Sequence, residues 1–310
     1  MYKSVPTDIK KIKLDNALFR LHKKSTGNSS FGMDNTPDLL DGAFGLYSTD
    51  NIKKKIGPIK TEYFRISLTR KGSAEFDIGL EKYQPKRNFI LFGVPGQIFS
   101  LHDFSNDFLA YYMLFTDLFI SESFQRLNKK QNFPFLTYSG LQCFELDEST
   151  AEEIEAIIFK MDNEIKRNQA NSAEMIRLYI QQTLILANRN YGKLLIENPG
   201  QSNTLKNLFD SYLKLVSQHF LTIRKVSDYA SMLHVSADHL NRAIKACSDK
   251  TAHEFINEML VLEAKSFLLH SLMSVSEIAY TLDFSDPAHF NRFFKKHTDC
   301  TPNDFRNQNV

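Results

Sequence analysis

The sequence predicts an α+β protein made of a small antiparallel β-barrel, a helical connector and an all-α C-terminal part with two helix-turn-helix units. Three observations lead to this prediction. Between about residues 61 and 120, apolar and polar residues alternate with period two, which is typical of strands. From about residue 149 onward the apolar period becomes helical. Near the C-terminus one helical pattern occurs twice, which indicates two copies of one unit.

The composition is that of an ordinary soluble globular protein, with 310 residues, 42% apolar and 24% charged. No apolar run approaches the ~20 residues that span a bilayer, and the first residues have no apolar core of a secretory signal. Cys143, Cys247 and Cys300 are distant in sequence and odd in number, which favours a reduced compartment. We therefore expect a cytoplasmic protein without a membrane partner.

The net charge of +2 does not by itself indicate nucleic acid. Residues 201–310 hold as many acidic as basic side chains. An interface for DNA must therefore depend on where charges are placed locally, and not on the isoelectric point.

The strand pattern lies in the N-terminal half. Residues 1–60 carry few signals, and we expect irregular structure or edge strands there. Further on, residues 89–92 and 109–115 are nearly continuous apolar runs, as in strands buried on both faces. Turn residues separate these short segments, a pattern that predicts a small antiparallel barrel or jelly roll.

The inward faces of the predicted strands either line a ligand pocket or fill a hydrophobic core, and both alternatives stay open. Alternation along the strands selects eight candidate pocket residues. They are Phe64, Ile66, Phe76, Ile78, Phe99, Leu101, Tyr111 and Met113.

Two helical stripes follow the strands. They occupy residues 149–191 and are interrupted at 168–172, which predicts an αα-hairpin, with a linker expected over 192–203. The stripes either form a dimer interface or pack against the barrel. The predicted domains are a β-rich regulatory part at 1–148, a helical hairpin with its linker at 149–200, and a two-unit helical part at 201–310.

The repeat consists of two His-apolar-Asn-Arg segments, 239–242 and 289–292, which start 50 residues apart. An apolar ladder spaced i, i+3, i+4, i+7 precedes each segment, and Ser236 and Ser285 follow the ladders in helix N-cap position. Each unit is therefore a helix, a tight turn and a capped second helix. A helix-turn-helix places its second helix in the major groove of DNA, so two units predict two recognition helices.

Start signals define the remaining helices. A long helix from about 252 to 270 is expected to join the two units, with a capping-box pattern at 251–254 and another at 274–277, before the second unit. Thr301 and Pro302 place an N-cap and an N1 proline on a short last helix.

The segments 236–245, 276–296 and 301–306 resemble the AraC/XylS family of bacterial transcription regulators. The resemblance covers about a third of the chain. In that family a small cupin-like β-barrel that often binds an effector precedes the DNA-binding domain. The resemblance implies a sequence-specific DNA-binding transcription regulator, controlled by a small-molecule effector at the N-terminal barrel. The implied partners are double-stranded DNA, that effector, a second copy of the chain and, if the chain is an activator, RNA polymerase.

The chain departs from the family pattern at positions where glycine is common there. It has His234, Asp249, Asp283 and Asp299 instead. Glycine is favoured in such turns because they need positive φ, and His and Asp are among the non-glycine residues found in that region. We therefore expect the turns to survive. Leu260 also replaces a frequent arginine of the family's connecting helix.

The candidate DNA-binding residues lie on the two expected recognition helices. Arg242 and Arg292 are offset from the apolar stripes, and arginine bonds bidentately to guanine with ~1–3 kcal/mol of discrimination. The resemblance assigns base contacts to Asp238, His239, Arg242, Ala288, His289 and Arg292. Lysines are read as phosphate contacts. The full candidate set is Asp238, His239, Asn241, Arg242, Lys245, Ala288, His289, Asn291, Arg292, Lys295 and Lys296.

No enzyme signature stands out: there is no Gly-rich phosphate loop, no G-x-S-x-G and no H-E-x-x-H. His102 is the only histidine between residues 60 and 120, fewer than a cupin-type metal enzyme assembles. His239 and His289 belong to separate units. We expect no catalytic residue, no metal and no cofactor. The alternative is a barrel enzyme or carrier whose C-terminal helices bind a protein.

Overall fold

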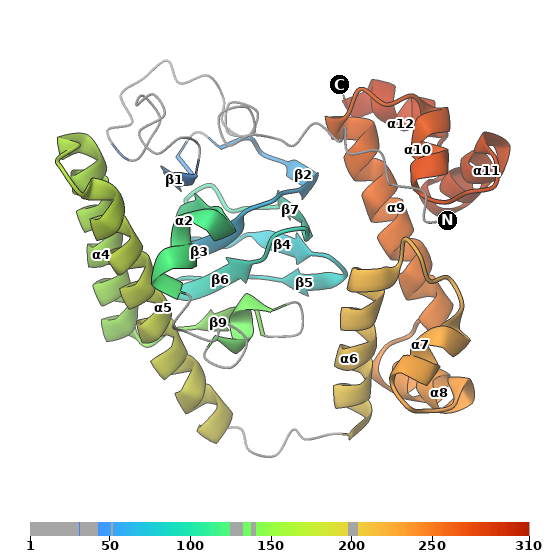
Figure 1. The fold of residues 1–310 in the computed structure, drawn as a ribbon, viewed down its shortest axis with the longest axis horizontal. Helices are drawn as coiled ribbons and strands as arrows, with labels where there is room; N and C mark the ends of the chain where they lie inside the picture. Colours follow the sequence, from blue (N-terminus) through green and yellow to red (C-terminus); the bar gives the residue numbers. More distant parts are fainter. Residues whose placement is uncertain are drawn as a thin grey trace.

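The structure is a computed structural model, and it describes residues 31, 43–50, 52–124, 133–137, 141–197 and 204–309. Strands fill the N-terminal half and helices the C-terminal half (Figure 1). The strands are β1 (Phe44–Ser48), β2 (Ile56–Lys60), β3 (Phe64–Lys71), β4 (Glu75–Ile78), β5 (Glu81–Tyr83), β6 (Phe89–Gly93), β7 (Ile98–His102), β8 (Leu109–Phe115) and β9 (Cys143–Glu145).

The strands form two antiparallel sheets, with the orders β1-β8-β3-β6-β9 and β2-β7-β4-β5. The prediction of short antiparallel strands is confirmed, but the described strands form two separate sheets and not one closed barrel. β1 and β2 lie at sheet edges, which agrees with the edge strands expected within residues 1–60. Much of residues 1–60 lies outside the described part of the chain.

Two helices cover the outer face of the five-stranded sheet (Figure 1). They are α4 (Glu148–Arg167) and α5 (Ser172–Glu197), and between them Asn168 adopts the left-handed conformation that ends α4. The predicted hairpin and its break are therefore confirmed. The predicted linker was wrong over 192–197, because α5 continues to Glu197; residues 198–203 lie outside the described part. Two short helices, α2 (Asp117–Phe124) and η1 (Pro134–Leu136), complete this half.

Both faces of the five-stranded sheet are buried. Ile66 on β3 packs toward α4 and α5, whereas its neighbour Arg65 lies on the face toward the second sheet. Tyr112 and Leu114 on β8 also belong to the cluster between the two sheets. A strand buried on both sides shows apolar residues in both registers, so alternation alone does not identify its inner face.

The C-terminal half consists of helices. They are α6 (Thr204–His219), α7 (Val226–Met232), α8 (Ala237–Cys247), α9 (Ala252–His270), α10 (Val275–Thr281), α11 (Pro287–Thr298) and α12 (Pro302–Asn309). α9 has the bounds that the sequence predicts, and it belongs to both helical cores: Ile256 and Leu260 pack in the first, and Phe267 and Leu268 in the second. Leu260, which stands where the family often has arginine, is therefore a core residue.

Helix caps follow the sequence signals with one exception. Both capping boxes form, at Thr251 and Ser274, and the Ser236 hydroxyl accepts from the His239 N–H at 3.2 Å. Ser285 does not cap α11. Asp286 does, accepting from the His289 N–H at 2.7 Å. The second unit has one extra residue before the helix, and Pro287 follows Asp286 at the first helical position.

The turns that lack glycine keep the conformation that glycine favours in three of four cases. His234, Asp283 and Asp299 have φ of 56°, 58° and 61°. Asp249 does not have positive φ, so that expectation was wrong. The reason is that α8 ends at Ser248 in an extended conformation, with φ −153°, and needs no left-handed residue.

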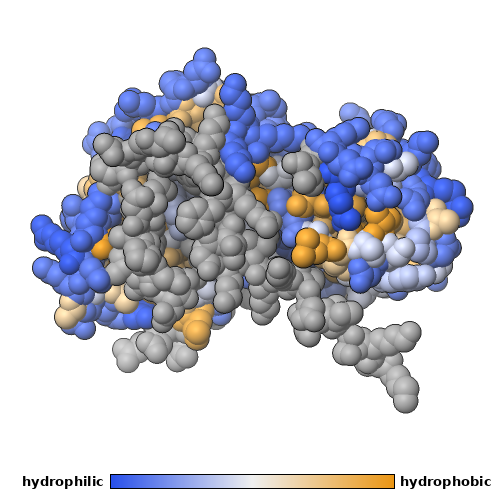
Figure 2. All heavy atoms as spheres, turned by 90° about the horizontal axis from the view of Figure 1, so that it is seen from above, coloured by the Kyte–Doolittle hydropathy of each residue, from blue (hydrophilic) through white to orange (hydrophobic). Residues whose placement is uncertain are grey.

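The described surface is largely hydrophilic. Figure 2 shows apolar residues gathered on the lobe at the right, which carries α9–α12 in Figure 1. Leu272, next to α9, is 91% exposed and Tyr280 on α10 is 60% exposed. Among the described helices none has the length and apolar character needed to cross a membrane.

Candidate nucleic-acid interface

The candidate interface is formed by the two recognition helices, α8 and α11. Each has one buried face: Leu240 and Ile244 anchor α8, and Phe290 and Phe294 anchor α11, all fully buried. The opposite faces carry the predicted contact residues. Eight of these are exposed, namely Asp238, Arg242, Lys245, Ala288, His289, Arg292, Lys295 and Lys296. His239, Asn241 and Asn291 are half-buried.

Two of the candidates have partners within their own unit. Asn291 donates from Nδ2 to the Pro287 carbonyl at 2.9 Å, one turn back along α11. The His289 ring stands edge-on to Phe284, with centroids 5.4 Å apart. These contacts orient the side chains, and they leave Arg292, on the exposed face, as the candidate with the longest reach.

The cationic side chains of the two helices are not engaged elsewhere. Within the described part of the chain no ion pair involves Arg242, Lys245, Arg292, Lys295 or Lys296. α11 carries three of these cations and no acidic residue, whereas α8 also carries Asp238. A face with unpaired Arg and Lys attracts phosphate, and the attraction is stronger for α11 than for α8.

The N-terminus of α11 is capped by a carboxylate. At the start of α11, the hydrogen bond from the His289 N–H lowers the pKa of Asp286, so this cap is ionised at neutral pH. Burial, with the neighbouring Lys296, lowers the pKa of His297, so that ring is neutral at the other end of the helix. His297 therefore adds no positive charge to that of Arg292, Lys295 and Lys296 at neutral pH.

Contacts between the two units hold the recognition helices in a fixed relation. Phe293 of α11 packs against the core of the first unit. Arg224, in the loop before α7, donates to the Leu282 carbonyl at the end of α10 and lies over the Phe284 ring at 5.6 Å. The connecting helix α9 adds a continuous rigid element. These links favour binding of both helices as one body.

Sequence reasoning missed these links. Arg224 shows no periodicity or repeat that separates it from a solvated arginine. Arg306, which was quoted only as part of the closing segment, donates to the Leu268 carbonyl at 3.1 Å and to the Met273 carbonyl at 2.7 Å. Two arginines thus bond carbonyls around the second unit, and only the tertiary structure brings them there.

The eight candidate pocket residues do not share one cavity. Phe64, Ile66 and Met113 belong to the cluster under α4 and α5, and Tyr111 packs against it. The other four, Phe76, Ile78, Phe99 and Leu101, belong to the cluster between the sheets. A small cavity of about 20 Å³ there is lined by Phe76, Ile78 and Phe99, and also by Arg65, which the alternation did not select.

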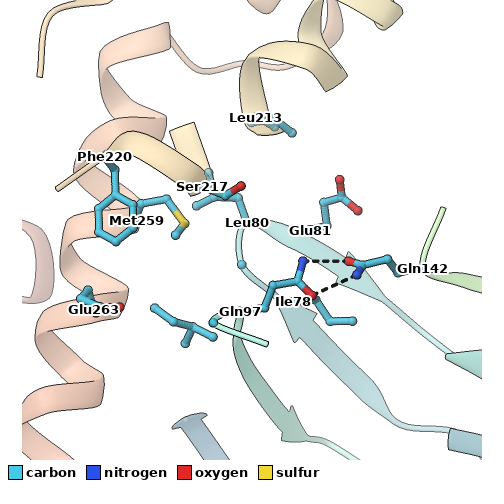
Figure 3. Close-up of a pocket in the computed structure, with 13 residues that line it drawn as sticks. Ile78, Leu80, Glu81, Gln97, Gln142, Leu213, Ser217, Phe220, Met259 and Glu263 are labelled. Carbon is cyan, nitrogen blue, oxygen red and sulfur yellow. Dashed lines mark hydrogen bonds between the residues drawn. The ribbon is translucent and has the colours of Figure 1, made fainter. Parts of the chain in front are cut away.

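A second small cavity, of about 30 Å³, lies between the sheets and the helices α6 and α9 (Figure 3). Ile78, Glu81, Gln97 and Gln142 line it from the N-terminal half. The C-terminal half contributes Leu213, Ser217, Phe220, Met259 and Glu263. The two halves of the chain therefore meet at a surface that carries both apolar and polar side chains.

His102 is the residue closest to a metal-site arrangement. Its Nε2 lies 2.9 Å from Asp77 Oδ2 and its Nδ1 2.8 Å from Asp103 Oδ2, with Glu75 also near. The bond to Asp77 raises the pKa of His102. Both ring nitrogens are thus already engaged by carboxylates, and hydrogen bonding accounts for the cluster.

Comparison with known proteins finds a matching domain model for part of the helical half. Residues 229–308 match a family model described as a helix-turn-helix domain. The chain is 26% identical over 161 residues to the HTH-type transcriptional activator RhaS of Escherichia coli O1:K1 / APEC. The alignment covers 52% of this chain and 56% of RhaS, so the chain spans about half the length of the curated relatives it matches.

Solved structures of similar proteins were also found. ToxT from Vibrio cholerae O395, bound to (E)-4-(8-methylnaphthalen-1-yl)but-3-enoic acid, aligns with 13% identity and a TM-score of 0.41, covering 86% of this chain and 100% of ToxT. An AraC-type regulator from Chromobacterium violaceum aligns with 21% identity and a TM-score of 0.32, covering 34% of this chain and 94% of that one. Residues 229–308 therefore match a helix-turn-helix domain, in the part of the chain where the sequence predicts the two units.

Proposed function

We propose that this protein is a sequence-specific DNA-binding transcription regulator that reads duplex DNA with α8 and α11. The observation that carries the proposal is the pair of capped helices with unpaired, exposed arginines at matched positions, Arg242 and Arg292. Arginine at such a position forms bidentate bonds to guanine in the major groove. The similarity to RhaS, an activator by its name, supports the same conclusion.

The other predicted contacts have distinct proposed roles. Lys245, Lys295 and Lys296 bond phosphates and set the position of the helices without reading sequence. Asp238 and His239 on α8, and Ala288 and His289 on α11, complete the base-reading positions. Because these pairs differ between the two helices, one copy of the chain reads an asymmetric site.

The N-terminal half is proposed to regulate and not to catalyse. Its described residues line one small pocket between the sheets and another against the helices, and a small effector is proposed to bind at one of them. ToxT was solved with a bound small acid, which supports effector control in proteins of this kind. A homodimer in the cytoplasm, with RNA polymerase as partner if the chain activates, completes the proposal.

The test is selection of random duplex DNA by the full chain, followed by sequencing of the retained fragments. We expect an enriched site with two half-sites about 10 base pairs apart, since adjacent major grooves on one face are one helical turn apart. The same selection on a variant with Arg242→Ala and Arg292→Ala is the control. If the wild-type chain enriches no sequence, or the variant enriches the same one, the proposal is wrong.

A further inference from the structure

The two helix-turn-helix units share the helix α9 and lie near its two ends (Figure 1). For both recognition helices to read one site, their relation must match the spacing of the major grooves. One extra base pair changes the separation of two half-sites by about 3.4 Å and rotates one against the other by about 35°. The contacts that hold α11 relative to α8 therefore decide which spacing the protein can read.

Arg224 forms such a contact, because it reaches from the first unit to the second. It stands in the loop between α6 and α7, and its Nη2 donates to the carbonyl of Leu282, 58 positions further along the chain. Leu282 is the C-cap of α10. Carbonyl groups at a helix C-terminus have no partner within the helix and lie at the negative end of its dipole. A guanidinium is therefore a well-matched donor at this position.

The loop that carries Arg224 is itself fixed to the first unit. The Ile223 N–H donates to the His219 carbonyl at 2.8 Å. The Ile223 carbonyl accepts from the Tyr229 hydroxyl at 3.0 Å, and Tyr229 is fully buried in the core of the first unit. Arg224 thus extends from a backbone that is bonded on both sides, so the bond to Leu282 resists movement of the second unit.

The turn that Arg224 holds leads directly into the second recognition helix. The Arg224 Cζ atom lies 5.6 Å from the centroid of the Phe284 ring, which is part of this turn. The Phe284 ring in turn lies 5.3, 5.1 and 5.4 Å from the rings of Phe290, Phe293 and His289 on α11. His289 is one of the proposed base-reading residues. One ring therefore separates the guanidinium from the exposed face of α11.

Arg224 is not an ordinary solvated charge. Its side chain is half-buried, and burial lowers its pKa, while the nearby Asp283 carboxylate acts in the opposite direction. The guanidinium is thus partly withdrawn from water and engaged by one carbonyl and one ring of the other unit. Its place is set by contacts on both units and not by solvent.

We propose that Arg224 is a positioning residue that sets the spacing between the two half-sites; this inference rests on the proposed function. Through the Leu282 carbonyl and the Phe284 ring, it holds α11 at one distance and one rotation from α8. A preorganised pair of helices binds the matching spacing without a cost for ordering, and it cannot follow a site with one base pair more or less. Arg224 acts in this way without contacting DNA.

The test measures binding of the full chain to three duplexes by fluorescence anisotropy. One duplex carries the site that selection enriches, and the other two have one base pair inserted or removed between the half-sites. The spacing penalty is the dissociation constant for an altered duplex divided by that for the selected one. For the wild type we expect a penalty of about tenfold or more, because one helix loses its base contacts.

Arg224→Met should lower this penalty about threefold or more, because it keeps the apolar stem but removes the donor and the charge that hold α11. It should also bind the selected duplex more weakly than the wild type does. Arg224→Lys keeps a cationic donor and should restore most of the wild-type penalty. If Arg224→Met is not folded at the temperature of the measurement, Arg224→Gln replaces it, and its penalty should fall in the same direction.

Lys225→Met is the matched control, since it removes an exposed charge at the next position of the same loop. It should leave the spacing penalty as in the wild type, even if its affinity for all three duplexes falls together. Thermal melting of each variant, followed by circular dichroism, shows how far the substitution changes stability. A change in stability alone does not alter the ratio that defines the penalty.

The proposal is overturned if the folded Arg224→Met chain and the wild type have the same spacing penalty, whatever their melting temperatures. It is also overturned if Lys225→Met lowers the penalty equally, because loss of charge would then explain the result. A wild-type chain that selects no site contradicts the proposed function, and this inference with it. A wild-type chain that selects a site but binds all three spacings equally contradicts this inference alone.

Discussion

Lys60 on β2 and Glu263 on α9 form an ion pair of 2.7 Å across the contact between the two halves of the chain. The Glu263 side chain is 2% exposed, and its second carboxylate oxygen, Oε2, is buried without a hydrogen-bond partner. Glu263 also lines the cavity between the halves (Figure 3). Helix α9, which joins the two helix-turn-helix units, is thus bonded to β2 through one oxygen of the Glu263 carboxylate. The other oxygen of this carboxylate is buried without a partner.

Removing the lysine of this pair should destabilise the full chain. Lys60→Met leaves the Glu263 carboxylate buried without its counter-ion, a change that costs about 2 kcal/mol of unfolding free energy. This is below the usual range for a buried pair because the Lys60 side chain is 33% exposed. Urea denaturation measures the loss, and Lys86→Met, at an exposed position, is the matched control.

A second variant distinguishes lost packing from uncompensated charge. Lys60→Met combined with Glu263→Leu removes both charges and should recover most of the stability, since an apolar pair often replaces a buried ion pair without loss. If the double variant is as unstable as Lys60→Met alone, the buried carboxylate is not the cause.

The two recognition helices should read separate parts of one site. Arg242→Ala and Arg292→Ala should each cost ~1–3 kcal/mol on the preferred sequence and relax the preference at different positions. Lys295→Ala should instead weaken all sequences alike and reduce the salt dependence, because a phosphate contact carries no sequence information. Selection sequencing of the three variants, with titrations at several salt concentrations, checks this. Arginine variants that both relax the same positions would contradict the assignment.

The cap of α11 should make stability depend on acid pH. The hydrogen bond from the His289 N–H lowers the pKa of Asp286 below its value in an unfolded chain. Its contribution is therefore complete above the unfolded pKa and is lost as the pH falls through the folded one. Asp286→Asn keeps the acceptor without the titration.

Thermal midpoints of the wild type and Asp286→Asn test this dependence. Between roughly pH 5 and pH 2.5, we expect the melting temperature of the wild type to fall further than that of the variant. Asp286→Ala, which has no acceptor, should melt below both at neutral pH. Parallel curves for the wild type and the asparagine variant would mean that the cap contributes nothing through its charge.

The outer face of α5 should form the interface of the proposed dimer. Met175, Leu178 and Ile185 stand on this helix and are 37%, 49% and 38% exposed, respectively. Leu178→Glu places a charge in this stripe and should shift the chain toward monomer in sedimentation over a wide concentration range. Leu118→Glu, at a position 82% exposed on α2, is the control and should leave the oligomeric state unchanged. A wild-type chain that is monomeric at all concentrations would exclude the dimer.

Local signals predicted most of the helical half. The capping boxes at Thr251 and Ser274 and the bounds of α9 are where the sequence places them, because caps and helical period depend on residues a few positions apart. Ser285 was the wrong cap because the repeat has one extra residue there, which a comparison of the two copies did not locate. Positive φ was expected at Asp249 from its position alone. It is not needed there, because the C-cap residue of α8, Ser248, has an extended backbone.

The amino-acid sequence by itself determined the repeated units, the exposed faces of their second helices and the type of the main elements. Each of these follows from periodicity and from contacts close along the chain. Only the tertiary structure decided which side of β3 faces the second sheet, because both sides are buried and both registers look apolar. It also placed Arg65 in a cavity, Arg224 on the Leu282 carbonyl and Glu263 against Lys60. These contacts join residues 58 or more positions apart or depend on how sheets stack, and no local pattern encodes them.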